Sequence, residues 1–85
     1  MMSSNWQKVP AVMSGGKQYF FVVRVEDTTY SRVWVAWSRR AQGWSVDALL
    51  HQCIPGSRPT VFLGEHKTAD AGIRAVESMF TLAPW

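Results

Sequence analysis

The chain has 85 residues, enough for one domain around a single core and too few for two. Its hydrophobic fraction of 47% and charged fraction of 18% are typical of folded proteins and argue against disorder. No apolar run reaches the roughly 20 residues of a membrane span. The first ten residues also lack the apolar core of a signal peptide. We therefore expect a cytoplasmic protein without membrane contact. The single cysteine, Cys53, cannot form an intrachain disulfide, and we expect neither a metal nor a cofactor.

The formal net charge of +3 attracts polyanions only mildly. The distribution of the cations is more informative than their sum. Five of the nine Lys and Arg residues fall between residues 17 and 40, namely Lys17, Arg24, Arg32, Arg39 and Arg40. This clustering favours an anionic partner over a uniformly solvated surface.

Residues 1–16 contain Pro10 and a Gly-Gly pair but no clear hydrophobic period. We interpret them as an irregular N-terminal arm whose Trp6 and Val12 are candidates to dock on the body. Residues 17–85 then form a single α+β domain.

The segment from Lys17 to Arg40 holds two runs rich in aromatic and β-branched residues, which predicts two paired strands. A three-residue loop at 27–29 sets Val22 opposite Trp34 and Arg24 opposite Arg32. This register gives one apolar face, which we predict to be the core face: Tyr19, Phe21, Val23, Val25, Val33, Val35 and Trp37.

Residues 44–54 fit two structures. Alternation of Trp44, Val46, Ala48 and Leu50 favours a strand, and a tight turn at 42–43 would set Trp37 opposite Ala48. The same segment also carries apolar residues at helical spacing, and a helix there would change the fold to ββαβα.

Thr60 to Gly64 is a short apolar run between breakers and predicts a further strand. Thr68 suits a helix N-cap, and helical spacing of apolar residues predicts a helix from about Ala69 to Leu82. Gly72 lies on its apolar stripe, so we expect close contact with the sheet there, with a tryptophan as a candidate neighbour. The predicted fold is α+β: an antiparallel meander of three to four strands with the C-terminal helix on one face.

The opposite face mixes aromatic and basic side chains and is the best pointer to function. Arg24 opposite Arg32 costs stability as a like-charge pair, so a ligand outside the fold could compensate. Aromatic side chains beside arginines are used to bind single-stranded nucleic acid. An exposed apolar face equally marks a protein interface or a homodimer. The predicted binding residues are Phe20, Arg24, Arg32, Trp34, Arg39 and Arg40, with Tyr30, Leu49 and His51 expected on the same face. Arg39 and Arg40, beside a turn, are also consistent with simple solvation.

Catalysis is not expected. His51, Cys53 and His66 with Asp47 or Asp70 supply the residue types of a nucleophile, a base and an orienting acid, but no local arrangement joins them. We therefore predict a non-enzymatic binding module, with nucleic acid and protein as alternative partners.

The order of strand and helix from Thr60 to Phe80 loosely resembles the DNA-binding arms of phage integrases and the last elements of double-stranded RNA-binding domains. The aromatic residues Phe20 and Trp34 depart from the polar sheet face of the first family. The second expects several lysines at the helix start, where this chain has Lys67 alone. No family is assigned on these residues. The small size also suits an accessory protein of a phage or other mobile element.

Overall fold

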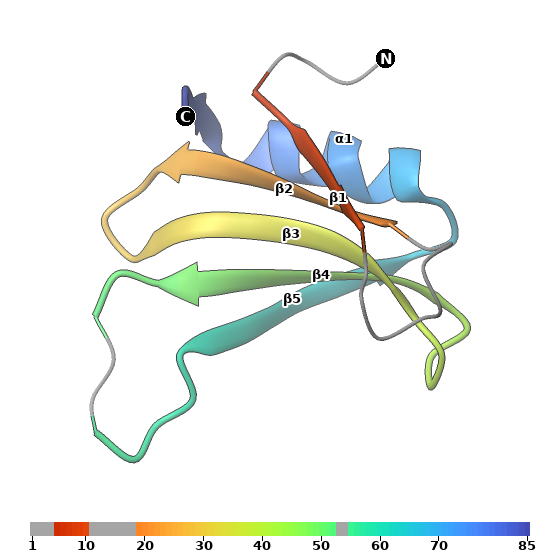
Figure 1. Cartoon of the computed structure of the whole chain (residues 1–85), viewed down its shortest axis with the longest axis horizontal. Helices are drawn as coiled ribbons and strands as arrows, with labels where there is room; N and C mark the ends of the chain where they lie inside the picture. The colour runs from red at the N-terminus through yellow and green to blue at the C-terminus, as the bar shows by residue number, and fades with distance from the viewer. Residues whose placement is uncertain (1–4, 11–18, 53–54) are drawn as a thin grey trace.

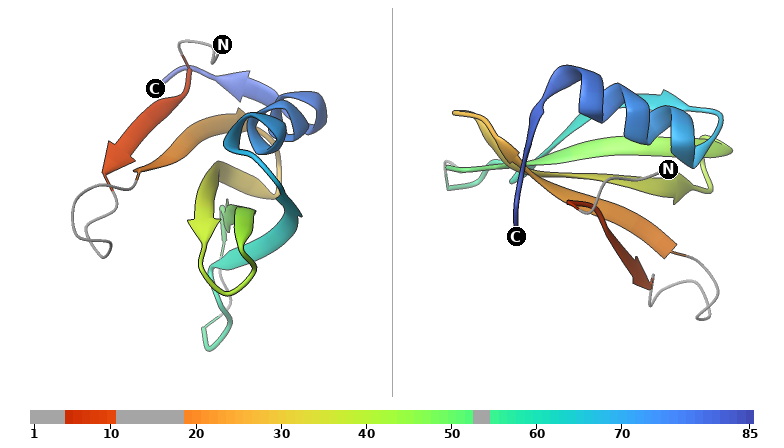
Figure 2. Two further views of the ribbon diagram at one scale, coloured as in Figure 1. Left: turned by 90° about the vertical axis from the view of Figure 1, so that its right-hand side faces the viewer. Right: turned by 90° about the horizontal axis from the view of Figure 1, so that it is seen from above.

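The protein is an antiparallel sheet with one helix against one of its faces (Figures 1 and 2). The structure, a computed structural model, describes residues 5–10, 19–52 and 55–85. The sheet order is β1-β2-β3-β4-β5, and β6 also pairs with β2. The elements are β1 (Gln7–Pro10), β2 (Tyr19–Glu26), β3 (Tyr30–Ser38), β4 (Gly43–Leu50), β5 (Thr60–His66), α1 (Ala69–Met79) and β6 (Thr81–Ala83).

The predicted α+β class is confirmed, but the sheet has more strands than the three to four expected. The two extra strands share one edge of β2. β1 pairs with Tyr19 to Val22, and β6 pairs with Arg24 to Glu26. Residues 7–10 were expected to be irregular because they show no hydrophobic period. They form a strand because β2 offers an unpaired edge, and Pro10 is tolerated at the end of such an edge strand.

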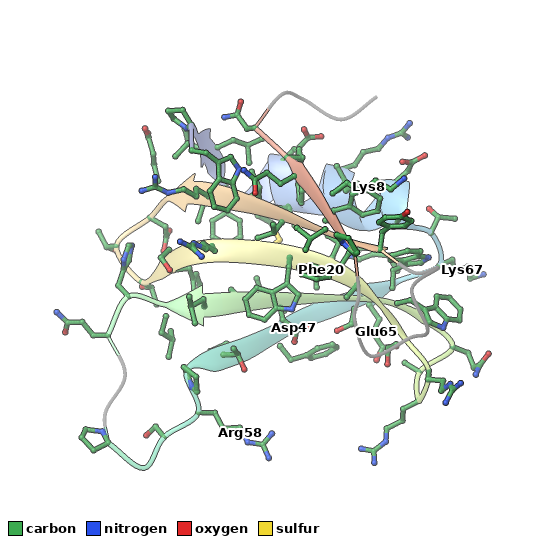
Figure 3. All side chains as sticks on the ribbon, in the orientation of Figure 1. Lys8, Phe20, Asp47, Arg58, Glu65 and Lys67 are labelled. Atoms are coloured by element: carbon green, nitrogen blue, oxygen red, sulfur yellow. The ribbon has the colours of Figure 1, made fainter. Side chains whose placement is uncertain are left out.

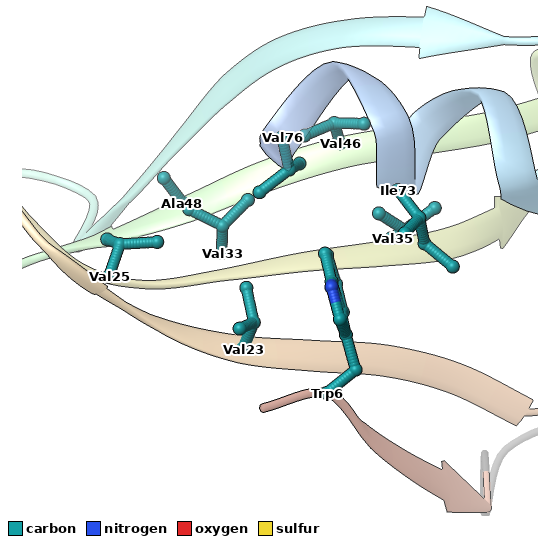
Figure 4. Packing of buried hydrophobic residues seen from close by; sticks show 9 residues of the cluster. All are labelled: Trp6, Val23, Val25, Val33, Val35, Val46, Ala48, Ile73 and Val76. Carbon is teal, nitrogen blue, oxygen red and sulfur yellow. The ribbon is translucent and has the colours of Figure 1, made fainter. Parts of the chain in front are cut away.

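The core lies between the sheet and α1 (Figure 4). Valines of β2, β3 and β4 meet the buried residues of the helix, and the side chain of Trp6 enters the same layer from the start of β1. The buried hydrophobic residues are Trp6, Val23, Val25, Val33, Val35, Val46, Ala48, Ile73 and Val76. The docking expected of Trp6 is therefore confirmed, whereas Val12 lies outside the described residues.

The β2–β3 hairpin has the predicted register, with Val22 opposite Trp34 and Arg24 opposite Arg32. One expectation for this hairpin is wrong. The pairing of β3 with β4 shifts between Tyr30 and Arg32, and this irregularity turns Tyr30 to the helix side. There the Tyr30 ring packs edge-on against Phe80, with centroids 5.9 Å apart. Tyr30 is therefore not part of the face opposite the helix.

Residues 43–50 form a strand, as the alternating pattern favoured, and the ββαβα alternative is wrong. The predicted register of this strand is also wrong, because Trp37 lies opposite Trp44 rather than Ala48. The loop between β3 and β4 holds four residues instead of a two-residue turn at 42–43, and Gln42 adopts a positive φ of 55°. The shift of four residues is even, so each side chain stays on its predicted face.

The helix ends earlier than predicted. Thr68 caps its N-terminus by accepting a hydrogen bond from the Ala71 N–H at 3.1 Å, as expected. At the other end Phe80 leaves the helical conformation, and Thr81 and Leu82 pair with β2 instead of extending α1. The backbone groups of these residues are satisfied by the sheet, and Leu82 packs against the core. Among the described residues no helix is long and apolar enough to cross a membrane.

The loop between β2 and β3 is held by a single carboxylate. Asp27 Oδ2 accepts hydrogen bonds from the Thr29 N–H at 2.8 Å and the Tyr30 N–H at 2.9 Å. The Asp27 carbonyl oxygen also accepts a hydrogen bond from His51 Nε2 at 2.9 Å. The hydrogen bond from the Tyr30 N–H, followed by that from Thr29, holds the pKa of the Asp27 carboxyl below its ordinary value.

A lowered pKa makes this loop sensitive to acid. The ionised carboxylate contributes stability above the pKa of the unfolded chain, and that contribution is lost as pH falls through the lower folded pKa. We expect Asp27→Asn to remove this part of the acid dependence while retaining a side-chain acceptor. Thermal unfolding midpoints, measured from neutral pH to below pH 4, should converge for variant and wild type in acid. Glu26→Gln is the matched control; equal acid slopes in Asp27→Asn and wild type would contradict the assignment.

Candidate functional site

The sheet face turned away from α1, here called the outer face, is turned toward the viewer in Figures 1 and 3. The strand registers place one set of alternating residues from β2 to β5 on it. No described helix or strand lies over this face (Figure 2). Its members are Phe20, Val22, Arg24, Glu26, Arg32, Trp34, Ala36, Ser45, Asp47, Leu49, Thr60, Phe62 and Glu65.

A row of side chains crosses the middle of the outer face. Val22, Trp34, Asp47 and Phe62 are successive partners on β2, β3, β4 and β5. Phe62 is 58% exposed, more than the other large hydrophobic residues among those described. Phe20 on β2, which Figure 3 labels, adds a third aromatic side chain to this face. The centre of the outer face is therefore apolar apart from Asp47, with Phe62 exposed and Val22, Trp34 and Phe20 half-buried.

One end of the outer face is basic. Arg24 and Arg32 are direct partners on β2 and β3, so their charges face solvent from neighbouring positions. The ring of Trp85 lies against Arg32, with 5.3 Å from its centroid to the guanidinium carbon, and the Trp85 Nε1 donates a hydrogen bond to the Asn5 carbonyl oxygen at 2.7 Å. This cation–π contact stabilises the Arg32 charge within the chain.

The opposite side of the outer face carries carboxylates. Asp47 lies on β4 beside Trp34, and its Oδ2 accepts a hydrogen bond from the Ser45 hydroxyl at 2.8 Å. Glu65 on β5 is the partner of Ser45 and is exposed. The outer face thus has two arginines on β2 and β3, with Glu26 beyond Arg24, and two carboxylates on β4 and β5. Asp47 lies within the central row beside Trp34, and Glu65 lies toward the end of the face away from Arg32.

The structure separates the predicted site residues into two groups. Phe20, Arg24, Arg32 and Trp34 lie together on the outer face. Arg39 and Arg40 lie in the β3–β4 loop, at the far end of β3 from Arg32, so they add nothing to the basic end. His51, also expected on this face, follows the end of β4 and binds the Asp27 loop.

Sequence reasoning missed four residues of the site, Asp47, Phe62, Glu65 and Trp85. Phe62 was in a predicted strand, but the pairing of β4 with β5 shifts between Val46 and Asp47, and this irregularity obscures which side chains share a face. Asp47 was considered only as a catalytic acid. Trp85 follows a proline and carries no periodic signal that could have placed it.

Other chemical candidates are dispersed. His66 pairs with Trp44 at one end of the β4–β5 ladder, and His51 lies beyond the other end. Cys53 lies outside the described residues. Within the described parts of the chain, no group of three or more His, Cys, Asp or Glu side chains is placed to hold a metal ion.

An open hollow lies between the β3–β4 loop and the end of β5. Its lining is Ala41, Gln42, Gly43, Glu65, His66 and Lys67. It brings together no pair of groups that sequence reasoning had proposed for catalysis.

No family model, no curated protein and no solved structure matches this chain.

Proposed function

We propose that this protein is a small, non-enzymatic binding module whose outer face packs against an apolar protein surface. The observation that carries the proposal is the central row of Val22, Trp34, Asp47 and Phe62, which is apolar apart from Asp47 and over which no described helix or strand lies. A sheet normally buries both faces against other layers when both are apolar, and here α1 covers only one. The partner surface is apolar at its centre, acidic where it meets Arg24 and Arg32, and basic where it meets the opposite side.

The charges on the outer face favour protein over nucleic acid. A nucleic-acid platform combines aromatic rings with a continuous basic groove along the phosphates. On the outer face Asp47 lies directly beside Trp34, where it repels a phosphate. Arg32 already stacks on Trp85, and Arg39 and Arg40 lie at the far end of β3. The basic residues therefore do not line a path across the aromatic rings.

Hydroxyl-radical footprinting tests whether anything covers the outer face. The radicals oxidise exposed aromatic and methionine side chains. We expect Phe62 to be labelled strongly in dilute pure protein and weakly in a concentrated extract of cells that express the chain. Met79 on α1 is the matched control, because it is 57% exposed and Phe62 is 58% exposed. Unlike Phe62, Met79 lies away from the outer face.

The outcomes separate the partner classes. Protection of Phe62 that survives nuclease treatment and is absent at Met79 supports a protein partner. Protection that disappears with nuclease shows that the partner is nucleic acid. Equal labelling of Phe62 in dilute protein and in extract contradicts the proposal altogether.

A further inference from the structure

We infer that the surface which covers the outer face is the outer face of a second copy of this chain. This inference rests on the proposed function and names its partner. The outer face carries Arg24 and Arg32, followed by Glu26, on β2 and β3, and it carries Asp47 and Glu65 on β4 and β5. The first group therefore has a net charge of +1 and the second a net charge of −2, with Trp34 between Arg32 and Asp47. A two-fold axis that lies in the plane of the contact and perpendicular to the line joining the two ends reverses that line. Each basic end then meets the acidic end of the other copy, and both contacts are equivalent.

Arg24 and Arg32 can form ion pairs with a second copy of the chain. Among the described residues, no acidic side chain forms an ion pair with Arg24 or Arg32. The two arginines repel each other across β2 and β3, and the Trp85 ring lies against only Arg32. A carboxylate from a second copy relieves this repulsion at the rim, while the apolar centre supplies the buried area.

The register also fixes the orientation of the two sheets. The separation between the Arg24–Arg32 pair and the acidic pair has two components. It is about 10 Å perpendicular to the strands, because neighbouring strands lie roughly 4.8 Å apart, and about 10 Å parallel to them, because successive residues rise by roughly 3.3 Å. The line between the ends is thus inclined about 45° to the strands. The two-fold axis has the same inclination, so the strands of the two copies cross at about 90°, one of the two arrangements in which sheets pack face to face. Trp34 lies near the axis and meets its counterpart.

The outer face is close to the smallest size that supports a specific dimer. The four strands β2 to β5, of seven to nine residues each, cover roughly 19 by 26 Å, a projected area of about 500 Å². Each partner of a specific interface buries about 600 to 1,000 Å². The contact must therefore use the whole face, including the charged residues. Substitutions of those residues should therefore weaken dimerisation.

Charge reversal tests this arrangement by sedimentation velocity over a range of concentrations. One variant carries Arg24→Glu and Arg32→Glu, and the other carries Asp47→Lys and Glu65→Lys. Each variant alone sets like charges opposite each other twice, so we expect at least about a hundredfold weaker dimerisation than in wild type, which is about 2.7 kcal/mol. An equal mixture of the two variants restores both attractive contacts and should form a heterodimer. Arg39→Glu with Arg40→Glu is the control and leaves dimerisation unchanged.

Each result decides the inference. A dimeric wild type, two monomeric variants and a dimeric mixture support it, and recovery in the mixture also shows that both variants fold. Where Asp47→Lys prevents folding, judged by far-UV circular dichroism, Glu65→Lys alone replaces it. A wild type that stays monomeric at roughly 1 mM overturns the inference, as does a dimer that the variants do not weaken. Nuclease-resistant protection of Phe62 in extract, together with a monomeric pure protein, leaves the proposed function standing with a different protein partner.

Discussion

Trp6→Ala is expected to lower the free energy of unfolding by about 3–5 kcal/mol, the usual cost of removing a buried aromatic side chain. Trp6 is only 6% exposed and packs in the layer between the sheet and α1. Its Nε1 also donates a hydrogen bond to Glu77 Oε2 at 3.4 Å, which joins β1 to the helix across 71 residues of sequence. A domain of this size is stable by roughly 5–15 kcal/mol, so the variant loses a large share of its stability.

Urea unfolding followed by circular dichroism measures this loss. Trp37→Ala is the matched control, because Trp37 is the same residue type but 37% exposed, and it should cost clearly less. Glu77→Ala removes the hydrogen bond without the ring and should cost about 1 kcal/mol or less. A Trp6→Ala variant within about 1 kcal/mol of wild type would show that β1 is not anchored through the core.

The second large effect concerns the contact between α1 and β3. A Cβ added at Gly72 would lie 2.8 Å from Val35 Cγ1, and Val35 is fully buried. Alanine gains about 1 kcal/mol in helix propensity over glycine. Overpacking against a stiff β-branched side chain costs about 1–3 kcal/mol. We therefore expect Gly72→Ala to destabilise the wild type by up to about 2 kcal/mol in net terms.

The sign should reverse when Val35 is shortened. Val35→Ala alone costs about 2 kcal/mol because it empties part of the core. In that background the methyl group of Gly72→Ala has space, so Gly72→Ala should be neutral or stabilising. Chemical denaturation of the two single variants and the double variant gives the coupling directly. Additive effects of the two substitutions would contradict the close approach of α1 to β3.

The parts of the fold that could be predicted depend on local patterns. Alternation of apolar and polar residues identified the faces of β2 and β3, and the loop at Asp27 set their register. Thr68 and the apolar stripe that follows it located the start of α1. The β3–β4 register failed because Gln42 adopts a left-handed conformation that local sequence preference assigns to glycine.

The remaining parts depend on contacts between distant segments. Trp6 and Trp85 lie in short stretches without hydrophobic period. Trp6 is positioned by its burial between the sheet and α1 and donates a hydrogen bond to Glu77, whereas Trp85 donates a hydrogen bond to Asn5 and lies against Arg32. The pairing of β6 with β2 likewise required the fold to bring the two chain segments together. Single-sequence patterns carry no information on such pairings, so the edge of β2 was left unpartnered in the prediction.

The candidate site was predictable in its basic and aromatic half only. Phe20, Arg24, Arg32 and Trp34 follow from the β2–β3 register alone. The acidic half requires the pairing of β4 with β5, in which the register shifts after Val46. Without Asp47 and Glu65 the face looked suited to an anion, and with them it has two ends of opposite charge.

Isotope-filtered nuclear Overhauser spectroscopy on a mixture of ¹³C-labelled and unlabelled chain tests the central claim most directly, because it detects only contacts between copies. The outer-face dimer predicts intermolecular signals from the Trp34 and Phe62 rings to outer-face side chains of the other copy, and none from Met79 on α1. Intermolecular signals that arise from Met79 and spare Trp34 and Phe62 would contradict the account, as would the absence of any intermolecular signal at roughly 1 mM chain.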